Sequence, residues 1–215
     1  PDQIVFFNLK HQKDPARVAL VDGSGQETPF QIVSNGLLAV RARLAPNEKR
    51  KWTLCSSRVQ SQPSSDLGLT ETGSFFEITN RFIGIRIPKV PVNLKPTPSP
   101  IQGLKHRDGT WTATGPNYME RPALGMKVEW LERGPLLIRA KITYRYTRSE
   151  LRGAFEKEVI PAGEGNYACT IEMQSGQSSV LFQEYSEVEI AWGVNVDHGL
   201  TPDRAQYRGH HSTSI

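Results

Sequence analysis

Apolar and polar residues alternate with a period of two along much of this chain, and this alternation is what most constrains its fold. The clearest stretch is LIRAKITYRY, residues 137–146. Successive side chains of a β-strand point to opposite faces of its sheet, whereas a helix needs a period of about 3.6. One face therefore carries Ile138, Ala140, Ile142, Tyr144 and Tyr146, and the other carries Arg139, Lys141, Thr143 and Arg145.

Two other stretches show the same alternation. LLAVRARL, residues 37–44, has one wholly apolar face and one face that becomes basic, which predicts a half-exposed strand. RFIGIRIP, residues 81–88, places Ile83, Ile85 and Ile87 on one face and ends at a proline. We also expect strands over 4–9, 17–21, 74–79, 126–132, 154–160, 167–173, 180–190 and 191–196.

Glycine-containing turns separate these strands, and no segment shows sustained helical periodicity. The turns are DGSG (22–25), SNG (34–36), RDG (107–109), ERG (132–134) and AGEG (162–165). A chain of this length without helices is typical of β-sandwiches and barrels. The sequence therefore predicts an all-β fold, in which a small β-sandwich or barrel unit precedes a larger antiparallel β-sandwich.

One break in composition marks a boundary between the two units. SSRVQSQPSSDLGLTETGS, residues 56–74, is polar, rich in serine and nearly free of large apolar residues. It predicts a small β domain over 1–58, a linker over 59–73 and a larger β-sandwich domain over 74–215, which we expect to be truncated at its C-terminus. The five prolines of PKVPVNLKPTPSP, residues 88–100, indicate an extended surface loop.

Composition and charge argue against several classes of protein. The 26 Lys and Arg residues are interspersed among 22 Asp and Glu residues, so we expect no nucleic-acid partner. No apolar run approaches the roughly 20 residues of a membrane-spanning helix, so we expect no membrane partner. We expect no metal or cofactor, because the metal-binding spacings are missing and GEGNYA, residues 163–168, leads into strand-like sequence. Cys55 and Cys169 form either one disulfide or two buried thiols.

An ordered set of positions runs through the N-terminal unit and into the next strand: Val21, Asp22, Gly25, Pro29, Gln31, Ala42, Leu44, Pro46 and Asn80. The later WLERGPLLIRAKITYRY, residues 130–146, adds a strand led in by Gly-Pro. These features resemble the β-rich accessory region of large carbohydrate-active enzymes, a galactose-mutarotase-like supersandwich, as in exo-rhamnogalacturonan lyases and α-mannosidases. The resemblance implies a secreted or periplasmic parent protein whose active residues lie in a domain outside this chain.

The loop DGTWTATGPNYMERP, residues 108–122, holds the best candidates for contact with a sugar. Trp111, Asn117, Tyr118 and Arg121 cluster there among glycines. Aromatic rings stack on the C–H faces of sugar rings, while amide and guanidinium groups hydrogen-bond to hydroxyls. The competing interpretation is that Trp111 and Tyr118 only cover the edge of the sandwich.

The closing residues YRGHHSTSI, 207–215, raise a second possibility. Arg208 and one of His210 and His211 would suit an acidic sugar, because arginine binds carboxylates bidentately and histidine exchanges protons near neutral pH. Neighbours on a strand point to opposite faces, so the two histidines are poorly placed to share a metal. We favour the simpler interpretation, a loop that leads into a further domain and performs no chemistry here.

Charged residues on the strands also allow two interpretations. Arg139, Lys141 and Arg145 would suit a polyanion, but Glu156 and Glu158 could pair with them across an antiparallel hairpin, which we favour. A catalytic carboxylate pair could come from Glu129 with Glu132, or from Glu184, Glu187 and Glu189. For both sets, surface carboxylates on strands are the simpler interpretation.

Because no acid–base set can be named from the sequence, we expect a non-catalytic β-sandwich portion of a polysaccharide-degrading lyase or glycoside hydrolase. It would support or partly line a site for a polysaccharide or oligosaccharide, acidic ones included, together with a downstream domain. The alternative is an extracellular β-sandwich module that binds protein and no sugar. A self-sufficient lyase or hydrolase is the third class.

Overall fold

The computed structural model describes residues 3–9, 18–56, 65–119, 121–149, 151–152, 159–160, 162–188 and 190–194. These residues form β-strands and no helix, which confirms the predicted all-β class. The strands are β1 (Gln3–Asn8), β2 (Val18–Asp22), β3 (Phe30–Ile32), β4 (Leu37–Ala42), β5 (Trp52–Ser56), β6 (Gly68–Glu71), β7 (Phe75–Thr79), β8 (Gly84–Pro88), β9 (Gly103–Lys105), β10 (Gly125–Arg133), β11 (Leu137–Arg148), β12 (Leu151–Arg152), β13 (Val159–Ile160), β14 (Gly163–Gln174) and β15 (Val180–Ser186). Across this part of the chain, no helix is long and apolar enough to cross a membrane.

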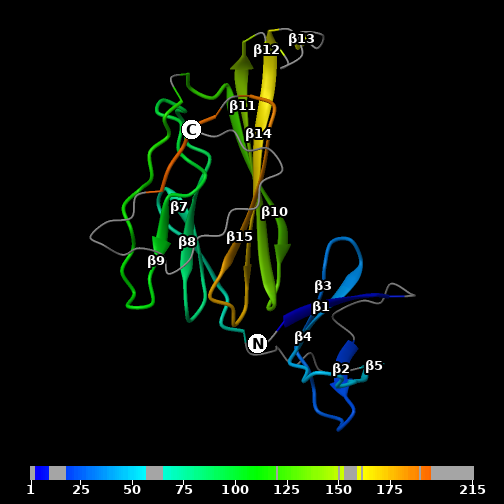
Figure 1. Cartoon of the computed structure of the whole chain (residues 1–215). Coiled ribbons are helices and arrows are strands. Elements are labelled where there is room, and N and C mark those ends of the chain that lie inside the picture. Colours follow the sequence, from blue (N-terminus) through cyan, green and yellow to red (C-terminus); the bar gives the residue numbers. More distant parts are fainter. Residues whose placement is uncertain are drawn as a thin grey trace.

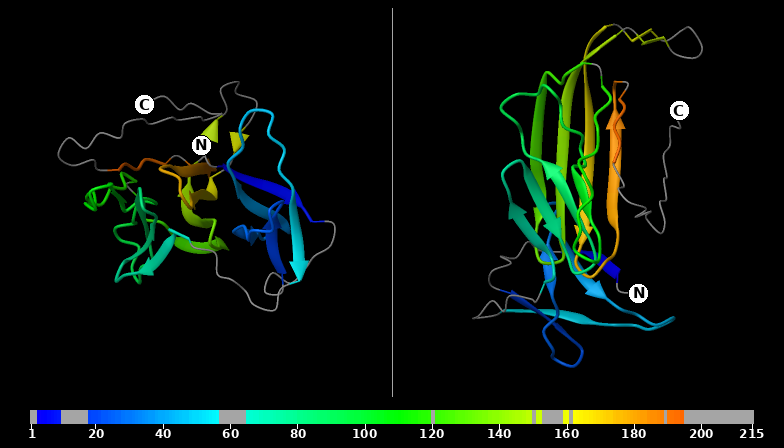
Figure 2. Two further views of the ribbon diagram at one scale, coloured as in Figure 1. Left: turned by 90° about the horizontal axis from the view of Figure 1, so that it is seen from below. Right: turned by 90° about the vertical axis from the view of Figure 1, so that its left-hand side faces the viewer.

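The larger unit is a sandwich of two antiparallel four-stranded sheets (Figure 1). One sheet has the strand order β6-β7-β8-β9, and the other has the order β10-β11-β14-β15. The hairpin β12–β13 projects beyond one end of β11 and β14, and the small unit lies at the other end of the sandwich (Figures 1 and 2). The small unit consists of the sheet β1-β4-β3 and the strand pair β2-β5.

The core of the sandwich forms on the apolar face predicted for residues 137–146. All five side chains of that face, from Ile138 to Tyr146, are 4% exposed or less. Antiparallel pairing of β11 with β14 over twelve residues adds a second buried row from β14. Ile78, Ile85 and Ile87 of the opposite sheet close the core, and each is fully buried. The period-two prediction is therefore confirmed for β11 and for residues 85–87.

Arginines on the outer face of β11 form ion pairs with glutamates of β14, which are not the predicted partners. Arg139 lies opposite Glu172 in the β11–β14 register, and its Nε donates to that carboxylate at 2.7 Å. Arg145 pairs with Glu164 of β14 at 3.1 Å. Glu156 and Glu158, the predicted partners, lie outside the described residues.

Strand β4 is buried on both faces, which corrects the half-exposed strand predicted for residues 37–44. Leu38 and Val40 pack in the small unit's own core against β2 and β5. Ala39, on the opposite face, is fully buried in a cluster with Leu136 of the β10–β11 turn. Ala39 of the face expected to meet solvent meets the larger sandwich instead, whereas Arg43 of that face is exposed as predicted.

A buried polar contact joins the two units beside this cluster. The Glu132 carboxylate, 6% exposed, accepts hydrogen bonds from the Ser34 N–H at 2.7 Å and the Ser34 hydroxyl at 2.6 Å, and a longer one of 3.4 Å from the Gln31 amide. In return, the Gln31 Oε1 accepts from the N–H groups of Leu136 and Leu137 at 3.2 and 3.0 Å. Each unit thus satisfies buried polar groups of the other.

The proline-rich segment 88–100 is a surface loop only in its first half. Val92 is fully exposed, but Thr97 and Ser99 are 7% and 1% exposed. Thr97 Oγ1 accepts a hydrogen bond from the Ala123 N–H at 2.7 Å, and Ser99 Oγ donates to backbone carbonyls, including that of Gly115 at 2.9 Å. Thr97 and Ser99 are buried because they hydrogen-bond to backbone groups of the loop that have lost contact with water. This corrects the extended surface loop predicted for the whole segment.

Some element boundaries also differ from the prediction. Strand β6 (Gly68–Glu71) lies within the range 59–73 expected to be a linker. The expected turn AGEG, residues 162–165, is mostly the start of β14, and GEGNYA accordingly lies in a strand. Within the described part of the expected strand 191–196, Trp192 forms one isolated bridge, to Asn117.

The two cysteines are both free thiols in different environments. Cys55 is exposed on β5, and Cys169 is buried in the core of the sandwich. Burial raises the pKa of the Cys169 thiol to about 12, so this group stays protonated. Of the two alternatives from the sequence, the disulfide is absent, and only Cys169 is a buried thiol.

The contact between the units gives a test at Gly134. A Cβ atom added there would overlap the Gln31 carboxamide. We expect Gly134→Ala to lower the free energy of unfolding by about 1–3 kcal/mol, the usual range for overpacking, and to loosen the small unit. Urea unfolding followed by tryptophan fluorescence measures the first effect, and limited proteolysis measures the second.

Gly73→Ala is the matched control, because no atom lies within 4 Å of the Cβ that it would add. It should leave both measurements close to those of the unchanged protein. Equal stability and equal protease resistance of the two variants would contradict the role assigned to the Gln31–Gly134 contact.

Candidate functional site

Trp111 of the predicted sugar-binding loop lies on the outer face of the sheet β6-β7-β8-β9. Its ring approaches Gly84, where a Cβ atom would stand only 3.0 Å from it. The Arg86 guanidinium lies 4.1 Å from the centre of the ring, and Glu77 holds that guanidinium through bonds of 2.8 Å to Nε and Nη2. Trp111 thus covers the outer face of the sheet and lies against the Arg86 guanidinium.

Asn117 and Tyr118 lie where the loop pairs with residues 191–193. The Tyr118 N–H donates to the Ala191 carbonyl, and the Gly193 N–H donates to the Pro116 carbonyl, both at 2.9 Å. The Tyr118 ring packs beside Gly193, yet this side chain is 65% exposed. A rigid backbone therefore presents an exposed aromatic ring.

The structure does not gather all the predicted sugar-binding residues. Trp111 contacts β8 and β9, Tyr118 contacts residues 191–193, and Arg121 is exposed a few residues further on. The other three candidates, Arg208, His210 and His211, lie outside the described residues. Tyr118 is the aromatic candidate that keeps an accessible face.

The described carboxylates that were candidates for catalysis have structural partners. Glu129 pairs with Lys127 at 2.7 Å, and Glu132 receives the bonds from the small unit described above. Glu187 accepts from the Asn166 N–H at 2.9 Å, and Glu184 accepts from the Tyr167 hydroxyl at 2.9 Å. Glu189 lies outside the described residues. These carboxylates therefore have structural partners, and Glu132 is buried, whereas the simpler interpretation had placed it on the surface.

Three tyrosines form a buried aromatic group inside the sandwich. Tyr144 stacks on Tyr146 with ring centres 6.2 Å apart, and Tyr167 lies 5.8 Å from Tyr144. The hydroxyl groups of Tyr144 and Tyr146 are buried without a hydrogen-bond partner. Burial raises the pKa of Tyr146; Asn117 is near enough to oppose this shift in part, although no hydrogen bond of ordinary geometry joins them. These phenols stay neutral.

A group of residues that the sequence did not single out meets at the end of the sandwich next to the small unit. We call Arg41, Arg81, Phe82 and Arg107 the arginine edge. The guanidinium carbons of Arg81 and Arg107 lie 4.6 and 5.5 Å from the centre of the Phe82 ring. Arg41 of β4 lies beside Gly176, with 3.4 Å between its Cζ and the Cβ that Gly176 lacks.

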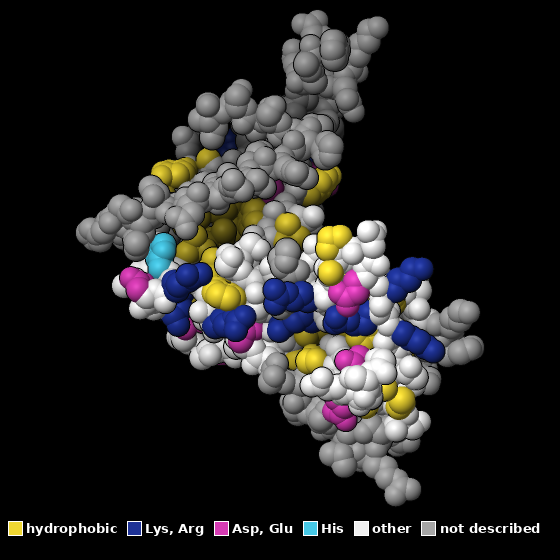
Figure 3. Space-filling view, turned by 60° about the horizontal axis from the view of Figure 1, so that its bottom comes forward, with side chains coloured by type: hydrophobic (Ala, Val, Ile, Leu, Met, Phe, Trp, Pro, Cys, Tyr) yellow, Lys and Arg dark blue, Asp and Glu magenta, His cyan; other side chains and the backbone are white. Residues whose placement is uncertain are grey.

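Asp66 connects the arginine edge. Its carboxylate accepts from the Ser175 hydroxyl and the Gly176 N–H, and it stands 3.6 Å from the Arg81 Nε. Burial alone would raise the pKa of Asp66, but hydrogen bonds from Ser175, Arg81 and Gly176 and the charge of Arg41 outweigh it and lower the pKa. Figure 3 turns the bottom of the Figure 1 view forward and shows a row of Lys and Arg side chains on that face.

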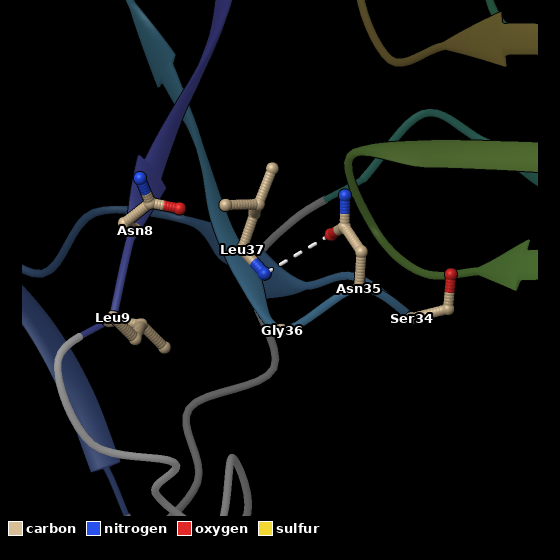
Figure 4. Close-up of a pocket in the computed structure, with 6 residues that line it drawn as sticks. All are labelled: Asn8, Leu9, Ser34, Asn35, Gly36 and Leu37. Atoms are coloured by element: carbon tan, nitrogen blue, oxygen red, sulfur yellow. Dashed lines mark hydrogen bonds between the residues drawn. The ribbon is translucent and has the colours of Figure 1, made fainter.

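A hollow on the small unit is lined by Asn8, Leu9 and the segment 34–37 (Figure 4). Asn35 Oδ1 accepts from the Leu37 N–H at 3.2 Å, so this amide stabilises its own turn. The lining residues carry no charged side chain. The hollow therefore offers little chemistry beyond hydrogen bonding.

The residues described here contain no cluster of three or more His, Cys, Asp or Glu side chains that could hold a metal ion. No protein-family model matches the chain, and no curated protein matches it. Among the described residues, Tyr118 and the arginine edge are candidate binding surfaces, and both are defined by geometry.

The tyrosine group gives a second test. We expect Tyr144→Phe and Tyr146→Phe to leave the free energy of unfolding unchanged or to raise it, because each removes a buried hydroxyl without a partner. Tyr167→Phe should lower it by about 0.5–3 kcal/mol, because it removes the 2.9 Å bond to Glu184. Urea denaturation of the three variants measures the difference. A larger loss in Tyr144→Phe than in Tyr167→Phe would show that the Tyr144 hydroxyl has a partner in solution.

Proposed function

We propose that this chain is a non-catalytic β-sandwich portion of a polysaccharide-degrading enzyme, which supports or partly lines a carbohydrate site. The observation that carries the proposal is Tyr118. Tyr118 is 65% exposed, while its own N–H and the carbonyl of Pro116 are hydrogen-bonded to residues 191–193. A rigid, exposed aromatic ring suits stacking on a sugar, because ordering it costs little conformational entropy.

The environment of the ring supports the same proposal. Arg121 is exposed nearby in the sequence and can donate hydrogen bonds to sugar hydroxyls. The carboxylates around the sandwich are engaged in structural bonds, as Glu132 and Glu184 illustrate. The proposal therefore gives the chain a binding role and assigns the reaction to groups in another part of the parent protein.

The alternative, a module that binds protein, has its own observation. Leu181 and Tyr185 of β15 are 51% and 66% exposed, and alternate residues of a strand share one face of the sheet. Exposed apolar residues of this kind occur at protein interfaces. The two functions thus place binding on different surfaces, one at Tyr118 and the other on β15.

Tyr118→Ala and Tyr185→Ala form a matched pair, because the two tyrosines are almost equally exposed. We screen the protein on a glycan array of neutral and acidic oligosaccharides and measure the positive sugars by calorimetry. Tyr118→Ala should weaken binding about tenfold, which corresponds to roughly 1.4 kcal/mol of lost stacking. Tyr185→Ala should leave it within about twofold.

A protein that binds no glycan, or that binds with equal affinity after Tyr118→Ala, would contradict the proposed function. An effect of Tyr185→Ala alone would move the sugar site to β15 and contradict the role given to Tyr118, whereas binding of no glycan at all favours the alternative. Thermal unfolding of both variants checks that each is folded, so that a loss of binding reports on the surface.

A further inference from the structure

We propose that the arginine edge binds a linear acidic saccharide, with carboxylates of a uronic-acid chain on Arg81 and Arg107. The saccharide class rests on the function proposed above, whereas the need for negative charge rests on the geometry of the arginines. This surface is separate from Tyr118, which contacts residues 191–193. The two surfaces can therefore be tested independently.

Contact with one aromatic ring positions both guanidinium groups to bind carboxylates. A guanidinium group over an aromatic face is held by cation–π attraction, and its N–H donors remain available in its own plane. Because both groups lie close to the Phe82 ring, their carbons are at most about 10 Å apart. Two carboxylates of one saccharide chain can therefore reach both arginines, and each carboxylate can be bound bidentately.

Short turns hold these side chains in place. Asn80 Oδ1 accepts from the N–H groups of Phe82 and Ile83 at 2.8 and 3.0 Å, and Asn80 Nδ2 donates to the carbonyls of Gln174 and Gln177. The turn before Arg81 and Phe82 is therefore fastened to the neighbouring β14–β15 turn. A fixed backbone lowers the entropy lost on binding.

The turn that carries Arg107 is equally well defined. The His106 N–H donates to the Thr110 carbonyl at 2.8 Å, and Gly109 adopts a φ of 93° that favours glycine. Asp108 accepts from the N–H and hydroxyl of Thr110, and these bonds lower its pKa. Asp108 is thus engaged with its own turn.

The charge of the edge remains available to a ligand. Asp66 receives bonds from Ser175 and Gly176 and stands 3.6 Å from the Arg81 Nε, a long separation for an ion pair. The Arg81 side chain is 65% exposed, and Arg107 is exposed too. Figure 3 shows a row of Lys and Arg side chains on this face of the molecule, a shape that suits a linear anionic chain better than a compact ligand.

The test is calorimetric titration with trigalacturonate at low salt. The double variant Arg81→Gln, Arg107→Gln should bind it at least tenfold more weakly than the unchanged protein, and added salt should weaken binding by the unchanged protein. Arg145→Gln is the matched control, since Arg145 of β11 is an exposed arginine that pairs with Glu164 of β14. It should change the affinity less than twofold. Phe82→Leu should also weaken binding, because it removes the stacking face and leaves the charges in place.

Equal affinity of the double variant and the unchanged protein would overturn the proposal. Tighter binding of duplex DNA or of inorganic sulfate than of trigalacturonate, with the same loss in the double variant, would also overturn it by showing a general anion site. Titration of the double variant with a neutral oligosaccharide that binds at Tyr118 distinguishes the proposed function from the proposed arginine-edge site. Retained neutral binding, with acidic binding unaffected by the arginine changes, would refute the arginine edge and leave the proposed function standing.

Discussion

The buried carboxylate of Glu132 is the group on which the arrangement of the two units depends. A charged group inside a protein is costly unless hydrogen bonds compensate for the lost water. Ser34 and Gln31 of the small unit provide those bonds, and Gln31 also accepts from the backbone of the β10–β11 turn. Neither unit could bury this contact by itself, because donors and acceptor belong to different units.

This contact also determines what lies at the end of the sandwich. The same junction that buries Ala39 of β4 brings Arg41, two residues later on the same face, beside the β14–β15 turn. There Asp66 receives hydrogen bonds from Ser175 and Gly176, and its charge is stabilised in part by Arg41. Arg41 of the small unit and Arg81 of the sandwich thus both act on Asp66, because the junction positions β4.

The two candidate surfaces use the β-sandwich in different ways. Tyr118 belongs to an irregular segment that pairs with residues 191–193, so its exposure is set by a loop. Arg81 and Arg107 lie on turns between strands, where short connections leave side chains exposed and the backbone restricted. Each surface therefore combines a rigid main chain with accessible functional groups. The interior tyrosines are different, because Tyr144 and Tyr146 contribute to the core and have no access to solvent.

The sequence by itself determined the all-β class and the inward face of β11, from Ile138 to Tyr146. Alternation is a local property, since each residue's face follows from its position along the strand. Only the tertiary structure decided that Ala39 is buried and that Glu172, rather than a residue of the next segment, pairs with Arg139. It also decided which surfaces combine: Arg81 and Arg107 meet at Phe82, while Trp111 and Tyr118 separate. These outcomes depend on contacts between residues far apart in the chain, and no local pattern specifies such contacts.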